Sequence, residues 1–147
     1  MNLLKNAELT QVINAVAAGT SDTTSGTILD MSGYDSVMFI LSLGDVTNTA
    51  VVTLQAQQNT ANSASGMATL ATATASVTAD ATSADNKLLV IDIHRPTERY
   101  IRAQVVRATA NAVIDCVIAI QYNAMSAPIT QGATVVASAF GASPAEA

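Results

Sequence analysis

Ser-Val-Met-Phe-Ile-Leu-Ser-Leu, at residues 36–43, is one of the most apolar stretches of the chain. Eight residues are few for a helix, and the stretch is rich in strand formers (Val37, Phe39 and Ile40), so it predicts a strand. Because apolar side chains occupy successive positions, we expect this strand to be central and buried on both faces. Residues 50–58 follow after a short turn and alternate apolar with polar side chains, which indicates a half-buried strand paired to the first.

The rest of the chain repeats short runs of strand formers separated by turn-length gaps. Residues 68–78 largely alternate Ala with Thr or Ser, and this period of two favours a strand despite the low complexity. Seven or eight strands without a long helical pattern predict an all-β sandwich or barrel. Further strands are expected at 12–17 (or a short helix from Leu3 onward), 27–31, 87–94, 99–107 and 112–122, with turns or loops at 19–26, 32–35, 44–49, 59–66, 79–86, 95–98 and 108–111.

Regularity fades after residue 124. Residues 134–137 have the composition of a brief strand, and residues 140–147 resemble an arm with one aromatic side chain, Phe140. Arms of this composition often become ordered only on a partner. We therefore divide the chain into a β-sandwich domain at 1–127, which includes an N-terminal arm, and a C-terminal strand or arm at 128–147.

The composition predicts a surface that sticks to other proteins. Charged residues make up 12% of the 147 residues, about half the usual ~25%. A surface of small hydroxyl and methyl groups is poorly protected against association, so we expect part of it to be covered in the working state. The net charge of −5 argues against binding nucleic acid. Polar residues interrupt both long uncharged runs, so we expect no membrane partner.

One His and one Cys limit the chemistry that the chain can perform. A single Cys excludes an internal disulfide and a thiolate cluster, and a single His weakens most acid–base schemes. Cys116 lies among apolar neighbours, which predicts a buried, inert thiol. The sequence contains neither a Gly-x-Ser-x-Gly elbow nor a Gly-rich phosphate loop. We expect no cofactor, no metal and no enzymatic activity.

The best candidate for a metal or catalytic site is His94 with Asp92. Two residues apart on a strand, they share a face, and Asp115 on a nearby strand is a possible third ligand. The alternative is structural: Asp92 pairs with Arg99 or Arg102, and His94 caps the turn. We favour the structural interpretation because such pairs are common in sheets.

Basic residues concentrate in one segment. Residues 87–107 hold five of the six basic side chains and two acidic ones, a net charge of +3, whereas the rest of the chain carries one minus nine, or −8. One interpretation is cross-strand pairing with Asp30, Asp35 or Asp115. The other is a basic stripe that faces an acidic protein surface. On the second interpretation, the candidate contacts with a partner are Arg95, Arg99, Arg102, Arg107 and, on the arm, Phe140.

Three blocks in this order are similar to a known group of proteins. They are Asp-Met-Ser-Gly-Tyr-Asp-Ser-Val-Met-Phe at 30–39, Lys-Leu-Leu-Val-Ile-Asp-Ile-His-Arg-Pro-Thr-Glu-Arg-Tyr-Ile-Arg at 87–102, and Asn-Ala-Val-Ile at 111–114 with Ala-Ile-Gln-Tyr at 119–122. The chain resembles, over about residues 12–125, the decoration or cement proteins that stabilise the heads of tailed bacteriophages.

The resemblance implies a jelly-roll-like, mainly antiparallel β-sandwich with extended terminal arms. It also implies a homodimer or homotrimer that binds the major capsid protein outside an icosahedral shell assembled in the host cytoplasm, and it implies no catalytic residues. An alternative is a carbohydrate- or receptor-binding module of the tail or neck. Five aromatic residues without Trp argue against that alternative, because sugar sites favour aromatic platforms. A small hydrolase is disfavoured by the lack of an acid–base set.

Overall fold

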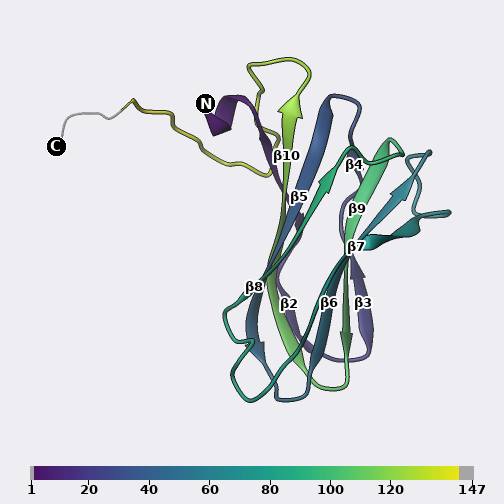
Figure 1. Ribbon diagram of the computed structural model, residues 1–147. Helices are drawn as coiled ribbons and strands as arrows, with labels where there is room; N and C mark the ends of the chain where they lie inside the picture. Colours follow the sequence, from purple (N-terminus) through teal and green to yellow (C-terminus); the bar gives the residue numbers. More distant parts are fainter. Residues whose placement is uncertain (1, 143–147) are drawn as a thin grey trace.

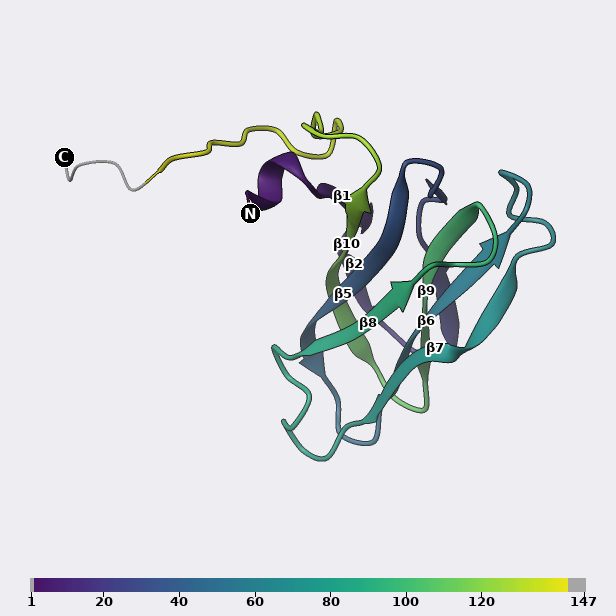
Figure 2. The same cartoon turned by 45° about the horizontal axis from the view of Figure 1, so that its top comes forward.

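The computed structural model describes residues 2–142 as two antiparallel β-sheets packed face to face (Figures 1 and 2). A short 3-10 helix, η1 (Leu3–Lys5), precedes the strands, and among the described residues no helix is long and apolar enough to cross a membrane. The strands are β1 (Glu8–Ile13), β2 (Val16–Gly19), β3 (Asp22–Ser25), β4 (Leu29–Asp30), β5 (Tyr34–Val46), β6 (Val51–Asn59), β7 (Ala68–Thr78), β8 (Leu88–His94), β9 (Tyr100–Ala108) and β10 (Ala112–Ala124).

The strand order is that of a jelly roll. The first sheet has the order β1-β10-β5-β8, with β2 also paired to β10, and the second has the order β3-β9-β6-β7, with β4 also paired to β9. When β1 is counted with β2 and β3 with β4, the chain crosses between the sheets at every connection except the one from β6 to β7, which are neighbours in one sheet. Counting β1 with β2 and β3 with β4, eight strand positions are filled, as in a double Greek key. The fold class expected from the sequence is therefore confirmed.

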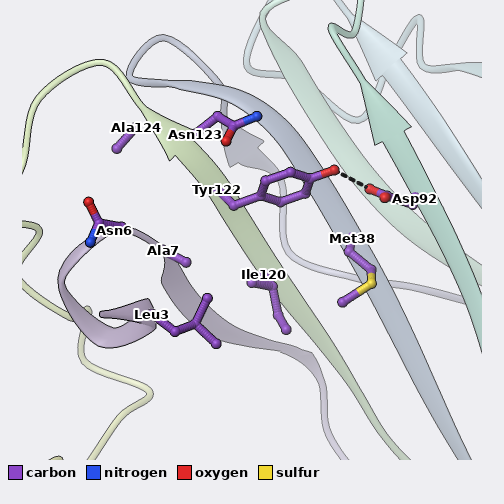
Figure 3. A pocket seen from close by; sticks show the side chains of 9 residues that line it. All are labelled: Leu3, Asn6, Ala7, Met38, Asp92, Ile120, Tyr122, Asn123 and Ala124. Atoms are coloured by element: carbon purple, nitrogen blue, oxygen red, sulfur yellow. Dashed lines mark hydrogen bonds between the residues drawn. The ribbon is translucent and has the colours of Figure 1, made fainter. Parts of the chain in front are cut away.

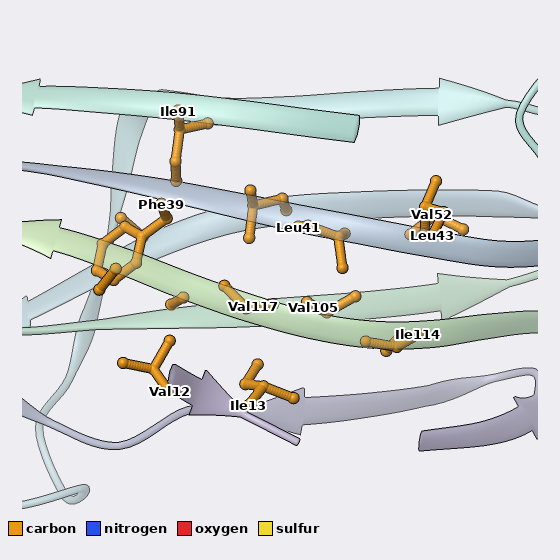
Figure 4. Close-up of a cluster of buried hydrophobic side chains, with 14 of the residues drawn as sticks. Val12, Ile13, Phe39, Leu41, Leu43, Val52, Ile91, Val105, Ile114 and Val117 are labelled. Atoms are coloured by element: carbon orange, nitrogen blue, oxygen red, sulfur yellow. The ribbon is translucent and has the colours of Figure 1, made fainter. Parts of the chain in front are cut away.

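The core lies between the two sheets and is filled by aliphatic side chains around one aromatic ring. Phe39 and Leu41 of β5 are fully buried there, as are Val52 and Leu54 of β6, and Figure 4 shows Val52 beside Leu43 of β5. Each such side chain contributes about 1.5–3 kcal/mol through burial. Every long strand except β7 supplies several members, so the two layers are held together along their whole length.

The apolar strand β5 is central, but it is not buried on both faces. Val37, Phe39 and Leu41 have no exposed surface, whereas Met38 and Ile40 between them are half-buried. The reason is that, among residues 2–142, only η1 and the C-terminal segment approach the outside of the first sheet. A continuous apolar run therefore conceals an outer face that remains partly open.

Differences also arise where the sequence is rich in Thr and Ser. The predicted turn at 19–26 contains β3, because β9 offers its backbone as a partner for Asp22–Ser25 and Thr favours extended backbone. The expected strand at 27–31 shortens to β4. The first expected strand begins earlier and divides into β1 and β2, and the helical alternative is limited to η1.

The chain after β10 turns back along β1 before it leaves the sandwich (Figure 1). Gln131 accepts a hydrogen bond from the backbone N–H of Leu9 at 2.9 Å and donates to the carbonyls of Leu4 and Ala7 at 2.9 and 2.8 Å. The expected strand at 134–137 is absent from this described segment, where the hydroxyl of Thr134 instead accepts from the N–H of Gln11. Of the predicted arm at 140–147, residues 143–147 lie outside the described residues.

Candidate functional site

The outer face of the first sheet carries rows of apolar side chains. The register places Ile120 opposite Met38, and Ile118 opposite Ile40, which in turn lies opposite Val90. Because directly opposed residues in a sheet point to the same side, these side chains form one continuous surface. We call it the outer apolar face, and it consists of Leu9, Met38, Ile40, Leu88, Val90, Ile118 and Ile120.

The outer apolar face is most exposed along β8. Leu88 is 59% exposed and Val90 is 44% exposed. The outside of the second sheet is different, because Gln55 donates to Gln104 at 2.6 Å and the hydroxyl of Thr53 bonds that of Ser76 at 2.8 Å. That polar, internally satisfied surface suits water, whereas contiguous exposed aliphatic side chains mark a contact surface for protein.

A cavity of about 540 Å³ lies at one end of the outer apolar face, under η1 (Figure 3). Leu3 and Ile120 point toward one another, and the ring of Tyr122 covers the opposite side. The hydroxyl of Tyr122 donates to Asp92 at 2.8 Å across the intervening strand. Burial raises the pKa of Tyr122, and the Asp92 carboxylate raises it further, so the phenol stays protonated at neutral pH. The cavity is therefore apolar, with polar groups on its rim.

The structure separates the three side chains of the candidate metal site. Asp92 accepts from Tyr122, and Asp115 accepts from Ser42 at 3.2 Å. The expected pairing of Asp92 with an arginine is therefore wrong, because the hydroxyl of Tyr122, on β10, is its hydrogen-bond partner instead. Within residues 2–142 no three His, Cys, Asp or Glu side chains are grouped so that they could hold a metal ion.

His94 lies near a serine and an aspartate, but not in the order that nucleophilic catalysis requires. Its Nδ1 is 2.9 Å from the hydroxyl of Ser36 and 3.8 Å from Oδ2 of Asp35. A catalytic serine and its orienting acid bind opposite nitrogens of the imidazole, whereas here both lie at the same one. Ser36 is also fully buried. His94 therefore joins β8 to β5 rather than capping the turn as expected.

Cys116 is half-buried on the outside of the first sheet, not buried as the sequence predicted. The pairing of β10 with β5 shifts between Ile114 and Cys116. Ile114 and Val117 are both fully buried, so the shift inserts one extra residue and reverses which side chains face outward. A regular alternation, read from the sequence, misses this bulge.

Two surface arginines lie in the cross-strand pairs that the sequence analysis offered as the structural interpretation. Arg99 contacts both carboxylate oxygens of Asp30, at 2.9 and 2.7 Å, and Arg95 contacts Asp35 at 3.1 Å. The hydrogen bond from Arg99 holds the pKa of Asp30 well below its usual range. The third suggested acid, Asp115, belongs to no such pair, since it binds Ser42.

The remaining predicted contact residues lie in different surroundings. Arg107 is only 2% exposed, and all three of its nitrogens donate within the chain, to Asp22 and two backbone carbonyls. Arg102 donates to Gln57 at 2.8 Å on the second sheet. Phe140 is 59% exposed, with the ammonium of Lys5 5.4 Å from its ring centre. Contact of these residues with a partner stays a prediction.

Sequence reasoning did not find the outer apolar face. The signal was present in the positions of Met38 and Ile40, which alternate with the core residues of β5. It is concealed because both sets are apolar, and only the pairing with Val90 and Ile118 shows that the second set forms a surface.

No protein-family model matches the chain, and no curated protein matches it. Among solved structures, the crystal structure of PBSX exported protein XepA matches with a TM-score of 0.54 and 17% identity, covering 97% of this chain and 46% of that one. The chain thus spans about half the length of that protein. At this identity the match shows the fold alone.

Two more distant matches cover most of both chains. A protein of Bacillus endospore appendages, described as a novel family of disulfide-linked pili, has a TM-score of 0.45 and 13% identity over 86% of this chain and 96% of that one. A protein of Desmodium yellow mottle tymovirus has a TM-score of 0.36 and 12% identity over 79% and 82%. Neither carries an argument about this chain.

Proposed function

We propose that this chain is a structural protein of a bacteriophage particle. It binds the outside of the icosahedral capsid and stabilises the shell by bridging major capsid subunits, without catalysing a reaction. The resemblance of residues 30–39, 87–102 and 111–122 to head decoration proteins supports the proposal. The observation that carries it is the outer apolar face, which the described residues leave open along β8.

The outer apolar face has the dimensions of a modest protein contact. Four strands spaced about 4.8 Å apart, with a rise of about 3.4 Å per residue, give a surface of roughly 300 Å². A patch of this size binds weakly alone, but many copies on one shell hold together through avidity. Small side chains dominate the remaining surface, so contacts there lose little rotamer entropy on burial.

The proposal is tested by sedimenting purified protein with phage capsids that lack it. Ile40→Lys places a charge in the middle of the outer apolar face, whereas Thr53→Lys places the same charge on the second sheet and serves as the matched control. We expect the first variant to lose at least about tenfold in affinity, since burying an unpaired charge costs more than 1.4 kcal/mol. Equal binding by both variants contradicts docking through this face.

A second candidate function is sugar binding at the cavity under η1. Tyr122 supplies an aromatic surface there, and Asn6, Asp92 and Asn123 supply polar groups around it. Chemical shifts of these side chains in ¹⁵N- and ¹³C-labelled protein, titrated with host-surface oligosaccharides, distinguish this function. Saturable shifts confined to the cavity favour the sugar, and unchanged shifts favour capsid docking.

A further inference from the structure

The two edges of the first sheet differ in how they are protected. At the β1 edge, the outward N–H groups of Leu9 and Gln11 donate to the side chains of Gln131 and Thr134. The C-terminal segment thus covers the backbone groups that would otherwise pair with another strand. Within residues 2–142, the opposite edge, β8, pairs with no strand other than β5.

The hydrogen bonds to β5 determine which groups of β8 point outward. The N–H of Arg95 donates to Asp35, and the carbonyl of Lys87 accepts from Leu43, so the odd-numbered residues of this segment face β5. Because the direction alternates along an antiparallel strand, the N–H and C=O groups of the even-numbered residues point to the free edge. These residues are Leu88, Val90, Asp92 and His94.

β8 lacks the proline, the bulge and the short length that usually prevent edge pairing, and Asp92 is its one carboxylate. Its seven residues keep an unbroken register with β5, and the strand contains no proline. By contrast, β7 breaks register between Gln55 and Gln57 of its neighbour, and β3 and β4 are only four and two residues long. Long, regular and apolar edge strands tend to pair with another chain. Among the described strands, β8 is therefore the edge strand best suited to such pairing.

We propose that β8 pairs antiparallel with β8 of a second copy, about a two-fold axis near Val90. The choice of a second copy rests on the proposed function, which places many copies side by side on one shell. In this register Val90 lies opposite its own counterpart, and outward side chains lie beside outward side chains. The outer apolar faces of both copies then form one continuous surface over eight strands.

The charges along β8 are compatible with this pairing. Lys87 lies immediately before the strand, and Asp92 lies near its other end. In the register centred on Val90, Asp92 of each copy lies opposite Leu88 of the other, and Lys87 has the parity of the inward-facing residues, so no two like charges lie opposite each other across the pairing. An isologous strand pair closes after two copies, so the assembly is a dimer and not a trimer. The small area predicts a weak dimer, with dissociation in the micromolar range.

Light scattering of the isolated chain across micromolar concentrations tests the pairing without a capsid. Ile40 and Val90 lie opposite each other on the same face, Ile40 on a central strand and Val90 on the edge. We expect a dimer for wild type and Ile40→Lys, and a monomer for Val90→Lys. Val90→Pro is a second variant, because it removes only an outward N–H and adds no charge. Unchanged melting temperatures show that the variants fold.

Hydrogen exchange of the wild-type chain gives a readout that no variant can disturb. The amides of Leu88, Val90 and Asp92 should exchange more slowly as the protein concentration rises. The exchange rates of amides on the neighbouring strand β5 should stay constant. A trimer, a monomer throughout, or an undiminished Val90→Lys dimer overturns the inference. A monomer that still sediments with capsids rejects the pairing alone, and a dimer that does not sediment rejects the proposed function alone.

Discussion

Arg107 and Asp22 lie 85 positions apart in the sequence and form a two-point ion pair that closes one end of the sandwich. Nε of Arg107 donates to Oδ1 of Asp22 at 2.7 Å, and Nη2 donates to Oδ2. Nη1 donates to the carbonyls of Ala17 and Ala112, at 2.7 and 2.5 Å. The guanidinium therefore ties together the ends of β2, β3 and β10, and its hydrogen bonds satisfy carbonyls of the interior.

Replacing this arginine should destabilise the fold. Arg107→Met leaves carbonyls without donors and Asp22 without its partner, which should cost about 3 kcal/mol. For a chain of this length, that corresponds to a fall of about 10 °C in melting temperature. Arg95→Met is the control, because Arg95 is 75% exposed and its pair with Asp35 contributes little. Similar melting temperatures for the two variants would contradict this account of Arg107.

Stability should depend on pH through Asp30. Arg99 lowers the pKa of this carboxyl from 3.8 in the folded chain, so the ionised form favours folding. Its contribution is complete above the unfolded value and is lost as pH falls toward the folded value. Because Asp30 is 43% exposed, we expect at most about 1 kcal/mol. Urea unfolding of wild type and Asp30→Asn should differ at pH 6 and converge between pH 4 and pH 2.

The predicted capsid contact of Arg99 is separable from its pairing with Asp30. A direct contact of Arg99 with the capsid predicts that Arg99→Glu weakens capsid binding about threefold to tenfold, because this variant reverses the charge. The variant also places the new Glu carboxylate beside that of Asp30, and the repulsion between these two groups should lower the melting temperature. The double variant Asp30→Arg/Arg99→Glu restores the ion pair. Binding that stays weak while melting temperature recovers indicates a direct contact, whereas recovery of both indicates a structural role.

The C-terminal segment should protect the β1 edge through two side chains. Gln131→Ala with Thr134→Val removes the acceptors for Leu9 and Gln11, and we expect a loss of about 1–3 kcal/mol together with concentration-dependent aggregation. Deleting residues 141–147 leaves both acceptors in place and should not change the melting temperature. Thermal melting with static light scattering measures both effects. A large fall in melting temperature when residues 141–147 are deleted would contradict the claim that Gln131 and Thr134 protect the β1 edge.

The strands with clear alternation could be located from the sequence. Residues 50–58 and 68–78 fall within one position of β6 and β7, because period-two patterns report half-buried strands directly. β3 was missed because Thr-rich segments extend only when a neighbouring strand accepts them, and that neighbour, β9, lies about 80 residues further on.

Side-chain partners were harder to predict than strands. The acidic partners of Arg99 and Arg95 were among those expected, although each pair joins residues at least 60 positions apart in the sequence. Asp22 was not expected for Arg107, since it stood in a predicted turn. The outer apolar face was missed because a continuous apolar run does not show which of its side chains face a second layer.

Electron cryomicroscopy of capsids incubated with the protein tests the central claim most directly. The account predicts added density on the outer surface of the shell, with the β1-β10-β5-β8 sheet toward the major capsid subunits and the polar outside of the β3-β9-β6-β7 sheet toward solvent. Density with the opposite sheet against the shell, or capsids that remain bare at saturating protein, would contradict it.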